Sequence, residues 1–427
     1  MEKNKEIVRI TRAELRQCKN IARGVLPISS GYQEKADILG IFGQNGTGKS
    51  AVTEAFSYLR CLLRGETLPP SAGAFIRLGS PESSCAFRFE IIGETRLPLE
   101  YVFTLVRREN GAALSREELI LLPDPSAGRK RRRSLLSFPG GRILPSKIRR
   151  AVSAVMVSGS SGLFGADIRE WTKQSLPSED VLRRAMEVLR AYGRNGLYVT
   201  YSASRAPAGM DLPLPGGETF RIPFSSWCVA EEPRMAEIRT ALPPFSGLLA
   251  AVIPGLEVIL RESGGGHTPE GRPGVRFTLM TRRDGKTIPL GQESEGIRKL
   301  LSLMSLLLRV YEDPSVCLVA DELDASLFEY LLGELLRVLE QDGLGQLVFT
   351  SHDLRPLEMI DRRKLLFTTA NPENRFIRLR GRGGNLRDQY LRSIALGGEA
   401  EAILPPTDPY AVSRAFRQAG RSLRGKD

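Results

Sequence analysis

Histidine and cysteine are scarce in this chain of 427 residues. It has two histidines, His267 and His352, which excludes a catalytic centre that needs several of them, such as an HNH nuclease, and also a histidine-rich metal site. Its five cysteines are scattered and no two form a C-x-x-C pair, which argues against a zinc site and a disulfide framework. We expect them to be thiols in a reducing compartment.

Long apolar runs are absent as well. No run in the sequence approaches the ~20 residues that span a bilayer, and the charged residues 1–6 are not followed by the core of a signal peptide. We therefore expect a cytoplasmic protein with no membrane partner. The length predicts two or three lobes. The formal net charge of +12 favours polyanions such as nucleic acid as partners.

A complete phosphate-binding motif, G-x-x-x-x-G-K-S, begins at residue 43. Its residues are Gly43, Gln44, Asn45, Gly46, Thr47, Gly48, Lys49 and Ser50. A strand-like apolar run, 38–42, precedes the motif, and apolar residues at helical spacing follow it. The glycines let successive N–H groups turn toward phosphate oxygens. Lys49 can reach the outer phosphates of ATP and Ser50 can give its hydroxyl to Mg²⁺.

Acidic residues follow a second apolar run. Residues 316–320 predict a buried strand, and Asp321 and Glu322 come directly after it. Asp321 is suited to hold Mg²⁺, and Glu322 to orient and polarise an attacking water. The next predicted strand, 346–350, leads to His352, which we interpret as a sensor of the γ-phosphate.

A helix start at residues 294–296 leaves two interpretations open. Ser294, Glu295 and Gly296 precede an apolar helix over 297–308. Bare N–H groups at such a start can bind phosphate, but an ordinary helix cap has the same sequence pattern.

The region between these motifs differs in character. Alternating apolar residues over 87–122 predict an antiparallel meander. The most basic segment follows it and contains Arg129, Lys130, Arg131, Arg132 and Arg133. This segment contacts nucleic acid or is a solvated loop, and the sequence favours neither. The Pro- and Gly-rich residues 205–226 are expected to be irregular.

Together these motifs resemble those of ABC-type ATPases. Residues 43–50 with Asn45 match Walker A, 294–296 the signature, Asp321 and Glu322 Walker B, Asp324 the D-loop, and His352 the H-loop. The chain is most similar to the branch with RecF, SMC and OLD-type proteins, and especially to short bacterial AAA proteins of abortive-infection and phage-defence systems. The similarity covers about 1–125 and 255–400.

The resemblance implies an α/β fold: a P-loop NTPase of the ABC head type, with a mixed central sheet, an antiparallel β subdomain and a mainly helical insertion lobe. The expected division is 1–125 and 251–400 for the two halves of the ATPase head, 126–250 for the insertion lobe and 401–427 for a basic tail. In such heads two chains close over two ATP molecules, and Ser294 and Gly296 of one chain would contact the nucleotide of the other.

Several features depart from the family pattern. The signature is not LSGGQ, and no glutamine between Gln44 and Gln174 can serve as a Q-loop. A long heptad arm is absent, and too little chain follows His352 for a TOPRIM-like domain, so a nuclease would have to be a partner.

We therefore predict an ATP- and Mg²⁺-dependent switch that forms a homodimer or higher homo-oligomer. It would control an effector, a nuclease or toxin encoded nearby, in bacterial anti-phage defence. Two alternatives remain: a RecF-like clamp that binds DNA in repair, and a nucleotide-bound scaffold with little turnover.

Overall fold

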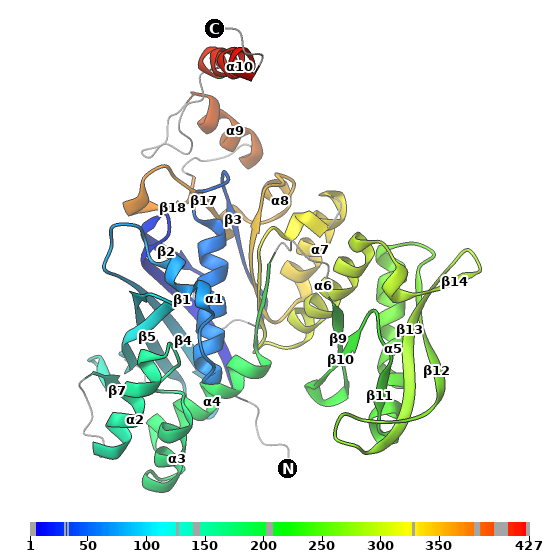
Figure 1. The fold of residues 1–427 in the computed structure, drawn as a ribbon, viewed down its shortest axis with the longest axis horizontal. Coiled ribbons are helices and arrows are strands. Elements are labelled where there is room, and N and C mark those ends of the chain that lie inside the picture. Colours follow the sequence, from blue (N-terminus) through cyan, green and yellow to red (C-terminus); the bar gives the residue numbers. More distant parts are fainter. Residues whose placement is uncertain are drawn as a thin grey trace.

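The chain is built around a central six-stranded sheet (Figure 1). The computed structural model describes residues 6–29, 31, 34–124, 128–139, 146–201, 208–326, 329–379, 385–396 and 409–423. The strand order is β18-β17-β3-β16-β15-β8. The strands are β3 (Asp37–Phe42), β8 (Leu197–Thr200), β15 (Cys317–Ala320), β16 (Gln346–Ser351), β17 (Leu365–Thr368) and β18 (Phe376–Ile377).

This sheet is mixed, as predicted. All neighbouring strands are parallel except β17 and β18, which are antiparallel. Because parallel strands end at the same edge of a sheet, the carboxyl ends of β3, β16, β15 and β8 lie side by side. Each of the predicted motifs that follow a strand therefore reaches this edge.

A second sheet is wholly antiparallel and has the order β2-β1-β4-β5-β6-β7. Its strands are β1 (Ile7–Cys18), β2 (Ile21–Pro27), β4 (Glu82–Ile92), β5 (Leu97–Arg108), β6 (Gly111–Leu121) and β7 (Arg133–Phe138). The predicted meander is confirmed as β4–β5–β6. Its inward side chains alternate with polar neighbours because successive residues of a strand face opposite sides of the sheet.

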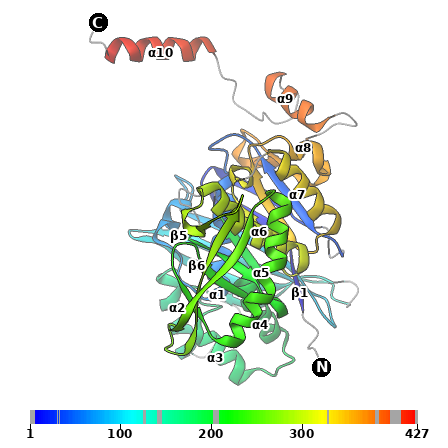
Figure 2. The ribbon, with the colours of Figure 1, turned by 90° about the vertical axis from the view of Figure 1, so that its right-hand side faces the viewer.

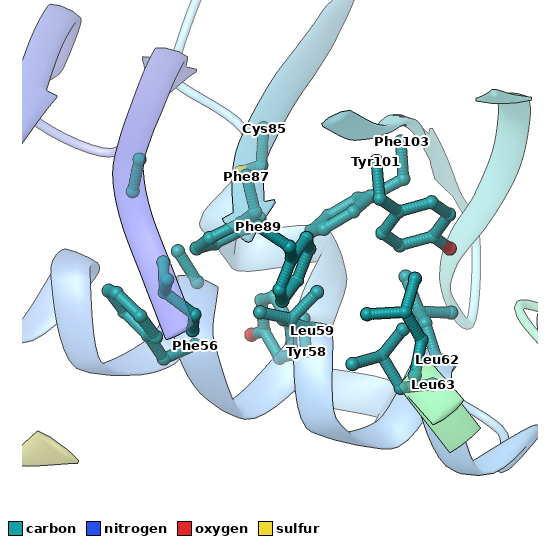
Figure 3. Close-up of a cluster of buried hydrophobic side chains, with 14 of the residues drawn as sticks. Phe56, Tyr58, Leu59, Leu62, Leu63, Cys85, Phe87, Phe89, Tyr101 and Phe103 are labelled. Atoms are coloured by element: carbon teal, nitrogen blue, oxygen red, sulfur yellow. The ribbon is translucent and has the colours of Figure 1, made fainter. Parts of the chain in front are cut away.

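One face of the central sheet packs on α1 (Lys49–Arg64) and α4 (Val181–Asn195), which share a hydrophobic core with the antiparallel sheet. Figure 3 shows Phe56 and Leu59 of α1 beside Phe87 and Phe89 of β4. The rings of Phe56 and Phe87 meet edge to face, with centroids 5.0 Å apart. The phosphate-loop helix is thus anchored by its apolar face.

The other face packs on α6 (Glu295–Glu312) and α7 (Glu329–Asp342), within a second core. This core continues into a lobe of α5 (Glu232–Val252) with the strands β11 (Cys228–Ala230), β12 (Glu257–His267), β13 (Pro273–Arg283) and β14 (Lys286–Pro289). Figure 2 shows this lobe facing the viewer. Asp284 and Gly285 both have positive φ, 50° and 75°, in the predicted hairpin turn between β13 and β14.

The elements between residues 126 and 250 are distributed over three parts of the molecule. Helices α2 (Ser146–Val157) and α3 (Ala166–Ser175) contact each other, and α2 contacts β6. Strand β8 is the edge strand of the central sheet, and α5 packs on β12. The proposed division at 125, 250 and 400 stays a prediction, and residues 125 and 400 themselves lie outside the described residues.

The expectation of irregular structure over 205–226 is wrong for part of that range. Strands β9 (Gly209–Pro213) and β10 (Thr219–Pro223) pair in an antiparallel hairpin around Pro215–Gly217. The proline and glycine residues therefore mark the ends and the turn of a hairpin rather than a loop.

The remaining helices are α8 (Pro356–Met359), α9 (Leu386–Leu396) and α10 (Pro409–Leu423). In Figure 2, α9 and α10 follow α8 at one end of the molecule. Among the described residues no helix is both long and apolar enough to cross a membrane.

Candidate nucleotide site at the carboxyl edge of the central sheet

The phosphate loop joins β3 to α1, and its glycines are required by its shape. Gly46 and Gly48 have φ values of 78° and 100°, which residues with a side chain rarely adopt. At Gly43 a Cβ atom would lie 1.7 Å from Thr368 Oγ1. The loop therefore needs glycine at each of the three positions, and α1 begins directly after it at Lys49.

Three side chains brace this loop from inside and outside. Thr47 Oγ1 donates to the Gln44 carbonyl at 2.7 Å, and Thr368 Oγ1, at the end of β17, lies 2.9 Å from Thr47 Oγ1. Asn20, in the turn between β1 and β2, donates its side-chain N–H to the Gly46 carbonyl. The loop is therefore preorganised by neighbouring strands as well as by its own glycines. Sequence reasoning missed Asn20 and Thr368, because each is remote in sequence from the loop it contacts.

Lys49 points back over the loop. Its Nζ donates to the carbonyls of Gly43 and Gln44 at 2.5 and 2.9 Å, and the residue is 5% exposed. Burial lowers the pKa of Lys49, whereas the carboxylates within 321–324 act in the opposite direction. The ammonium group is therefore held by the loop itself, and the acidic segment is near enough to influence its pKa.

The acidic pair lies at the same edge as the loop. β16 separates β3 from β15, so Asp321 is one strand away from the end of β16 and two from the loop. Asp321 is 9% exposed and accepts a hydrogen bond at Oδ1 from Thr350 Oγ1 at 2.6 Å. The backbone N–H of Glu322 donates to Thr350 Oγ1 at 2.7 Å. The neighbouring strand thus fixes both acidic residues.

His352 and Glu322 form the exposed side of the site. His352 Nε2 lies 3.9 Å from Glu322 Oε1, and both side chains are 38% exposed. Asp324 holds the histidine loop, because its Oδ2 accepts the backbone N–H groups of His352 and Asp353 at 3.0 and 3.1 Å. A reacting group placed between His352 and Glu322 would therefore be reachable from solvent.

The donor set is consistent with Mg²⁺. Ser50 is exposed in the first turn of α1, and the hydrogen bond between Asp321 and Thr350 uses Oδ1, which leaves Oδ2 to face a metal. In the described part of the chain no group of three or more His, Cys, Asp or Glu could hold a metal. Mg²⁺ commonly takes one or two protein oxygens and completes its shell with phosphate and water, so Ser50 and Asp321 suit it.

The predicted signature segment is not part of this cluster. Ser294 caps α6, since its Oγ accepts the Ile297 N–H at 3.3 Å, and Gly296 lies in the first helical turn. No described hydrogen bond joins Ser294 or Gly296 to the phosphate loop or to the acidic pair. Within a single chain, the segment acts as a helix cap.

Strand β8 brings residues to the site that sequence reasoning missed. The Asp321 N–H donates to the Thr200 carbonyl at 2.9 Å, so the end of β8 lies directly beside the acidic pair. Burial raises the pKa of Tyr201, with Asp321 among the charges that contribute. The signal was the short β-branched and apolar run 197–200 after an amphipathic helix, inside a region assigned as an insertion.

The basic segment near residue 130 is partly neutralised. Arg129 pairs with Asp124 at 3.1 Å, and Arg132 pairs with Glu100. Within the described residues, Lys130, Arg131 and Arg133 have no acidic partner and are exposed. Any phosphate contact from this segment would therefore depend on those three.

Comparison with known proteins gives one sequence family and several solved structures. Residues 230–358 match the family described as "AAA domain, putative AbiEii toxin, Type IV TA system". No curated protein matches the sequence.

The similar structures include an Smc head domain with an extended coiled coil bound to the C-terminal domain of ScpA from Pyrococcus furiosus. It is 14% identical, with coverage of 91% of this chain and 99% of that one and a TM-score of 0.45. The SMC head domain from Thermotoga maritima is 14% identical, with 87% and 100% coverage and a TM-score of 0.37. The recombination mediator RecF with ATP is 13% identical, with 81% and 94% coverage and a TM-score of 0.35.

A glycine loop precedes the helix at the end of β3, an acidic pair follows β15, and a histidine follows β16 at the same edge. A separate antiparallel sheet packs on the phosphate-loop helix. The fold is therefore α/β, as predicted, with a phosphate loop between β3 and α1, a mixed central sheet and a separate antiparallel sheet.

Proposed function

We propose that this protein is an ATP-hydrolysing switch that dimerises around Mg-ATP and controls a partner effector. The observation that carries the proposal is the position of Lys49, which is buried and hydrogen-bonded to the carbonyls of the phosphate loop, at the sheet edge where the acidic pair also lies. This arrangement places a cation for the phosphates and acidic groups for water activation at the same edge of the central sheet.

The chain's own residues would act as follows. N–H groups of the loop and of the first turn of α1 bind the phosphates, and Lys49 exchanges its carbonyl partners for phosphate oxygens. Mg²⁺, held by Ser50 and Asp321, supplies charge neutralisation at the phosphates. Glu322 orients a water and accepts its proton, and His352, 3.9 Å from Glu322, donates to the departing phosphoryl group.

Dimerisation is supported by the signature helix. α6 begins with a capped, glycine-containing turn that has no described contact to its own phosphate loop. The same turn is suited to contact the nucleotide of a second copy, because helix N-termini attract phosphate.

The test compares wild type with Glu322→Gln, an isosteric change that removes the base. We expect wild type to release phosphate from Mg-ATP and the variant to lose about 10²–10⁴-fold of this rate, as general bases contribute that much. The variant should still bind ATP and accumulate as a dimer or larger assembly in light scattering. Glu187→Gln, on the exposed side of α4, is the matched control. Nucleotide binding without turnover in wild type would instead favour the scaffold alternative.

The defence setting is supported by the family description, which names an AbiEii toxin and a type IV toxin–antitoxin system. We infer that the effector is a nuclease or toxin encoded nearby. Bacteria that carry the gene with its neighbours should resist phage plating, and Lys49→Ala should abolish that resistance. If phage plate equally well on bacteria with the wild-type gene and on bacteria with Lys49→Ala, the defence role is contradicted.

A second candidate is nucleic-acid binding, and the outer face of the antiparallel sheet favours it. Arg12, Arg16 and Arg23 all lie within 3.7 Å of the single carboxylate of Glu14. Arg16 and Arg23 also line a hollow of about 290 Å³. The hollow also contains Glu82 and Glu373, and the guanidinium groups of Arg16 and Arg23 are more than half exposed. Guanidinium groups bind phosphates with two parallel hydrogen bonds.

Double substitution of Arg16 and Arg23 by glutamine tests this candidate. Loss of two phosphate contacts should reduce the slope of log affinity against log salt by about 2 for duplex DNA. Arg239 and Arg282, exposed and paired with glutamates on the distant α5–β12–β13 lobe, are matched controls. An unchanged slope in the Arg16 and Arg23 variant rejects this face as the contact.

A further inference from the structure

A threonine at the carboxyl end of β16 contacts both acidic residues that follow β15. Thr350 Oγ1 lies 2.6 Å from Asp321 Oδ1 and 2.7 Å from the backbone nitrogen of Glu322. Thr350 is 1% exposed, so water does not compete for either bond. The contact is possible because β15 and β16 are parallel neighbours, which brings their ends together.

The direction of each bond follows from the chemistry of the groups. The backbone N–H of Glu322 can only donate, so the hydroxyl oxygen of Thr350 accepts from it. The single hydroxyl proton is then directed to Asp321 Oδ1. This bond fixes the rotation of the carboxylate and commits Oδ1, which leaves Oδ2 as the oxygen for a metal.

The same hydroxyl holds an unusual backbone conformation. Glu322 has φ of 47°, in the left-handed region, which is unfavourable for a residue with a side chain. The hydrogen bond from its N–H to Thr350 helps to offset that cost. In this conformation the Glu322 carboxylate lies 3.9 Å from His352 Nε2.

We propose that Thr350 is a positioning residue that sets the metal-facing oxygen of Asp321 and the water-facing direction of Glu322 through one hydroxyl group. This inference rests on the proposed ATPase function, because it assigns Asp321 to Mg²⁺ and Glu322 to water. Thr350 itself touches neither nucleotide nor water in this role.

A merely structural role for Thr350 predicts a different outcome. A buried hydroxyl that only satisfies its neighbours would affect the unfolding midpoint when it is removed, but not the Mg²⁺ dependence of nucleotide binding. The experiment therefore needs a measurement of metal binding that does not depend on turnover.

The decisive comparison is Thr350→Ser with Thr350→Ala, since these two side chains differ only in the hydroxyl. Thr350→Val keeps the volume and branching and also removes the hydroxyl. Thr172→Val is the control, because Thr172 is a buried threonine on α3 whose hydroxyl donates to the Arg169 carbonyl far from the site. Urea unfolding shows which variants are folded.

The readout is the binding of a fluorescent ADP, N-methylanthraniloyl-ADP, to the full chain as Mg²⁺ is titrated. Loss of a residue that orients a metal ligand typically weakens metal affinity by about 10–100-fold. We expect a rightward shift of that size in the Mg²⁺ titration for the alanine and valine variants. The serine variant and Thr172→Val should follow wild type. Phosphate release is measured in parallel and should fall with the same pattern.

Two outcomes would overturn the inference: alanine and serine variants with the same Mg²⁺ titration, or folded alanine and valine variants that match wild type. If wild type binds Mg-ADP but releases no phosphate from ATP, hydrolysis is rejected while the Mg²⁺ shift still decides the role of Thr350 toward Asp321. If the valine variant does not fold, the serine and alanine pair decides the question.

Discussion

Buried polar side chains fix several local conformations in this protein, and Glu117 is one that is fully enclosed. It is fully buried on β6, where its carboxylate accepts the hydroxyls of Tyr101 and Ser161 and the N–H groups of Gly162 and Leu163. These bonds attach the turn before α3 to the antiparallel sheet. Thr350 and Glu117 thus act alike, since each joins two segments through one polar group in a dry environment.

At this residue scale we predict a pH effect from Glu117. Burial raises the pKa of Glu117 above its ordinary value, so the folded chain keeps this proton to a higher pH than the unfolded chain. Stability from this group is therefore complete below the ordinary pKa and is lost as pH rises through the folded value. Glu117→Gln should remove this slope, measured as urea midpoints from pH 4 to about 8.

The glutamine variant should still fold, because its amide has the same shape and stays hydrogen-bonded: the oxygen accepts from the two backbone N–H groups, and the NH₂ donates to the oxygens of the two hydroxyls. Glu117→Ala leaves those partners unpaired and should cost on the order of 3 kcal/mol. An alanine variant as stable as glutamine would show that water replaces the carboxylate.

At the scale of the element, the first turn of α6 contains a glycine that the helix itself does not require. Ser294 supplies the cap, but Gly296 has no positive φ, and a Cβ atom added to it would meet no other atom within 4 Å. A glycine in a helix without a conformational reason costs about 0.5–1 kcal/mol relative to alanine. Its presence is consistent with close approach by another molecule, as the proposed dimer requires.

We predict that Gly296→Ala increases the free energy of unfolding by about 0.5–1 kcal/mol, seen as a higher urea midpoint. The same change should weaken ATP-dependent assembly. Assembly is measured by light scattering in the Glu322→Gln background, where hydrolysis does not disperse it. Should the alanine variant assemble as well as its parent, Gly296 is an ordinary helix residue and the dimer must use another surface.

Substitutions of Ser294 can distinguish a role in capping α6 from a role in binding phosphate. Ser294→Asp preserves a good cap, so the stability of α6 should be maintained, but its charge would oppose the phosphates of a partner's ATP. We expect normal unfolding and impaired ATP-dependent assembly. Ser294→Asn, a neutral cap, is the control, and equal assembly by both variants would contradict a trans contact.

At the scale of the whole molecule, the described residues form two hydrophobic cores separated by the central sheet. Along β15, Cys317 and Val319 belong to the core with α1, and Leu318 and Ala320 to the core with α6 and α7. The candidate nucleotide site lies at the edge of this shared sheet, with α1 on one side and α6 on the other. A ligand at this edge would therefore be held by residues that follow strands shared by both cores.

At this scale we predict that Mg-ADP stabilises the chain as a unit. At a nucleotide concentration of 100 times Kd the gain is about 2.7 kcal/mol, observed as an upward shift of one thermal transition. Lys49→Ala should remove the shift while the unfolding profile without nucleotide is maintained. A shift confined to one of two separate transitions would mean that the cores unfold independently.

Local sequence determined the phosphate loop, the acidic pair, the meander and the helix at 297–308, because each depends on neighbours in the chain: glycines that permit positive φ, and apolar residues repeating with the period of a strand or helix. Sequence could not identify Asn20, Thr368 or Thr350. Their roles depend on contacts with residues that are distant along the chain and close in the folded structure. It also missed β8, whose four residues are too few to show a period.

Tertiary structure alone decided which residues share the carboxyl edge. The parallel order β3-β16-β15-β8 is a matter of packing, and it gives Thr350 two acidic neighbours that are 28 and 29 positions away in sequence. It also pairs Arg132 with Glu100 of β5, which is 32 positions away in sequence. Local motifs therefore determine which chemical groups the site contains. The orientation of those groups depends on hydrogen bonds that form only when the sheet is complete.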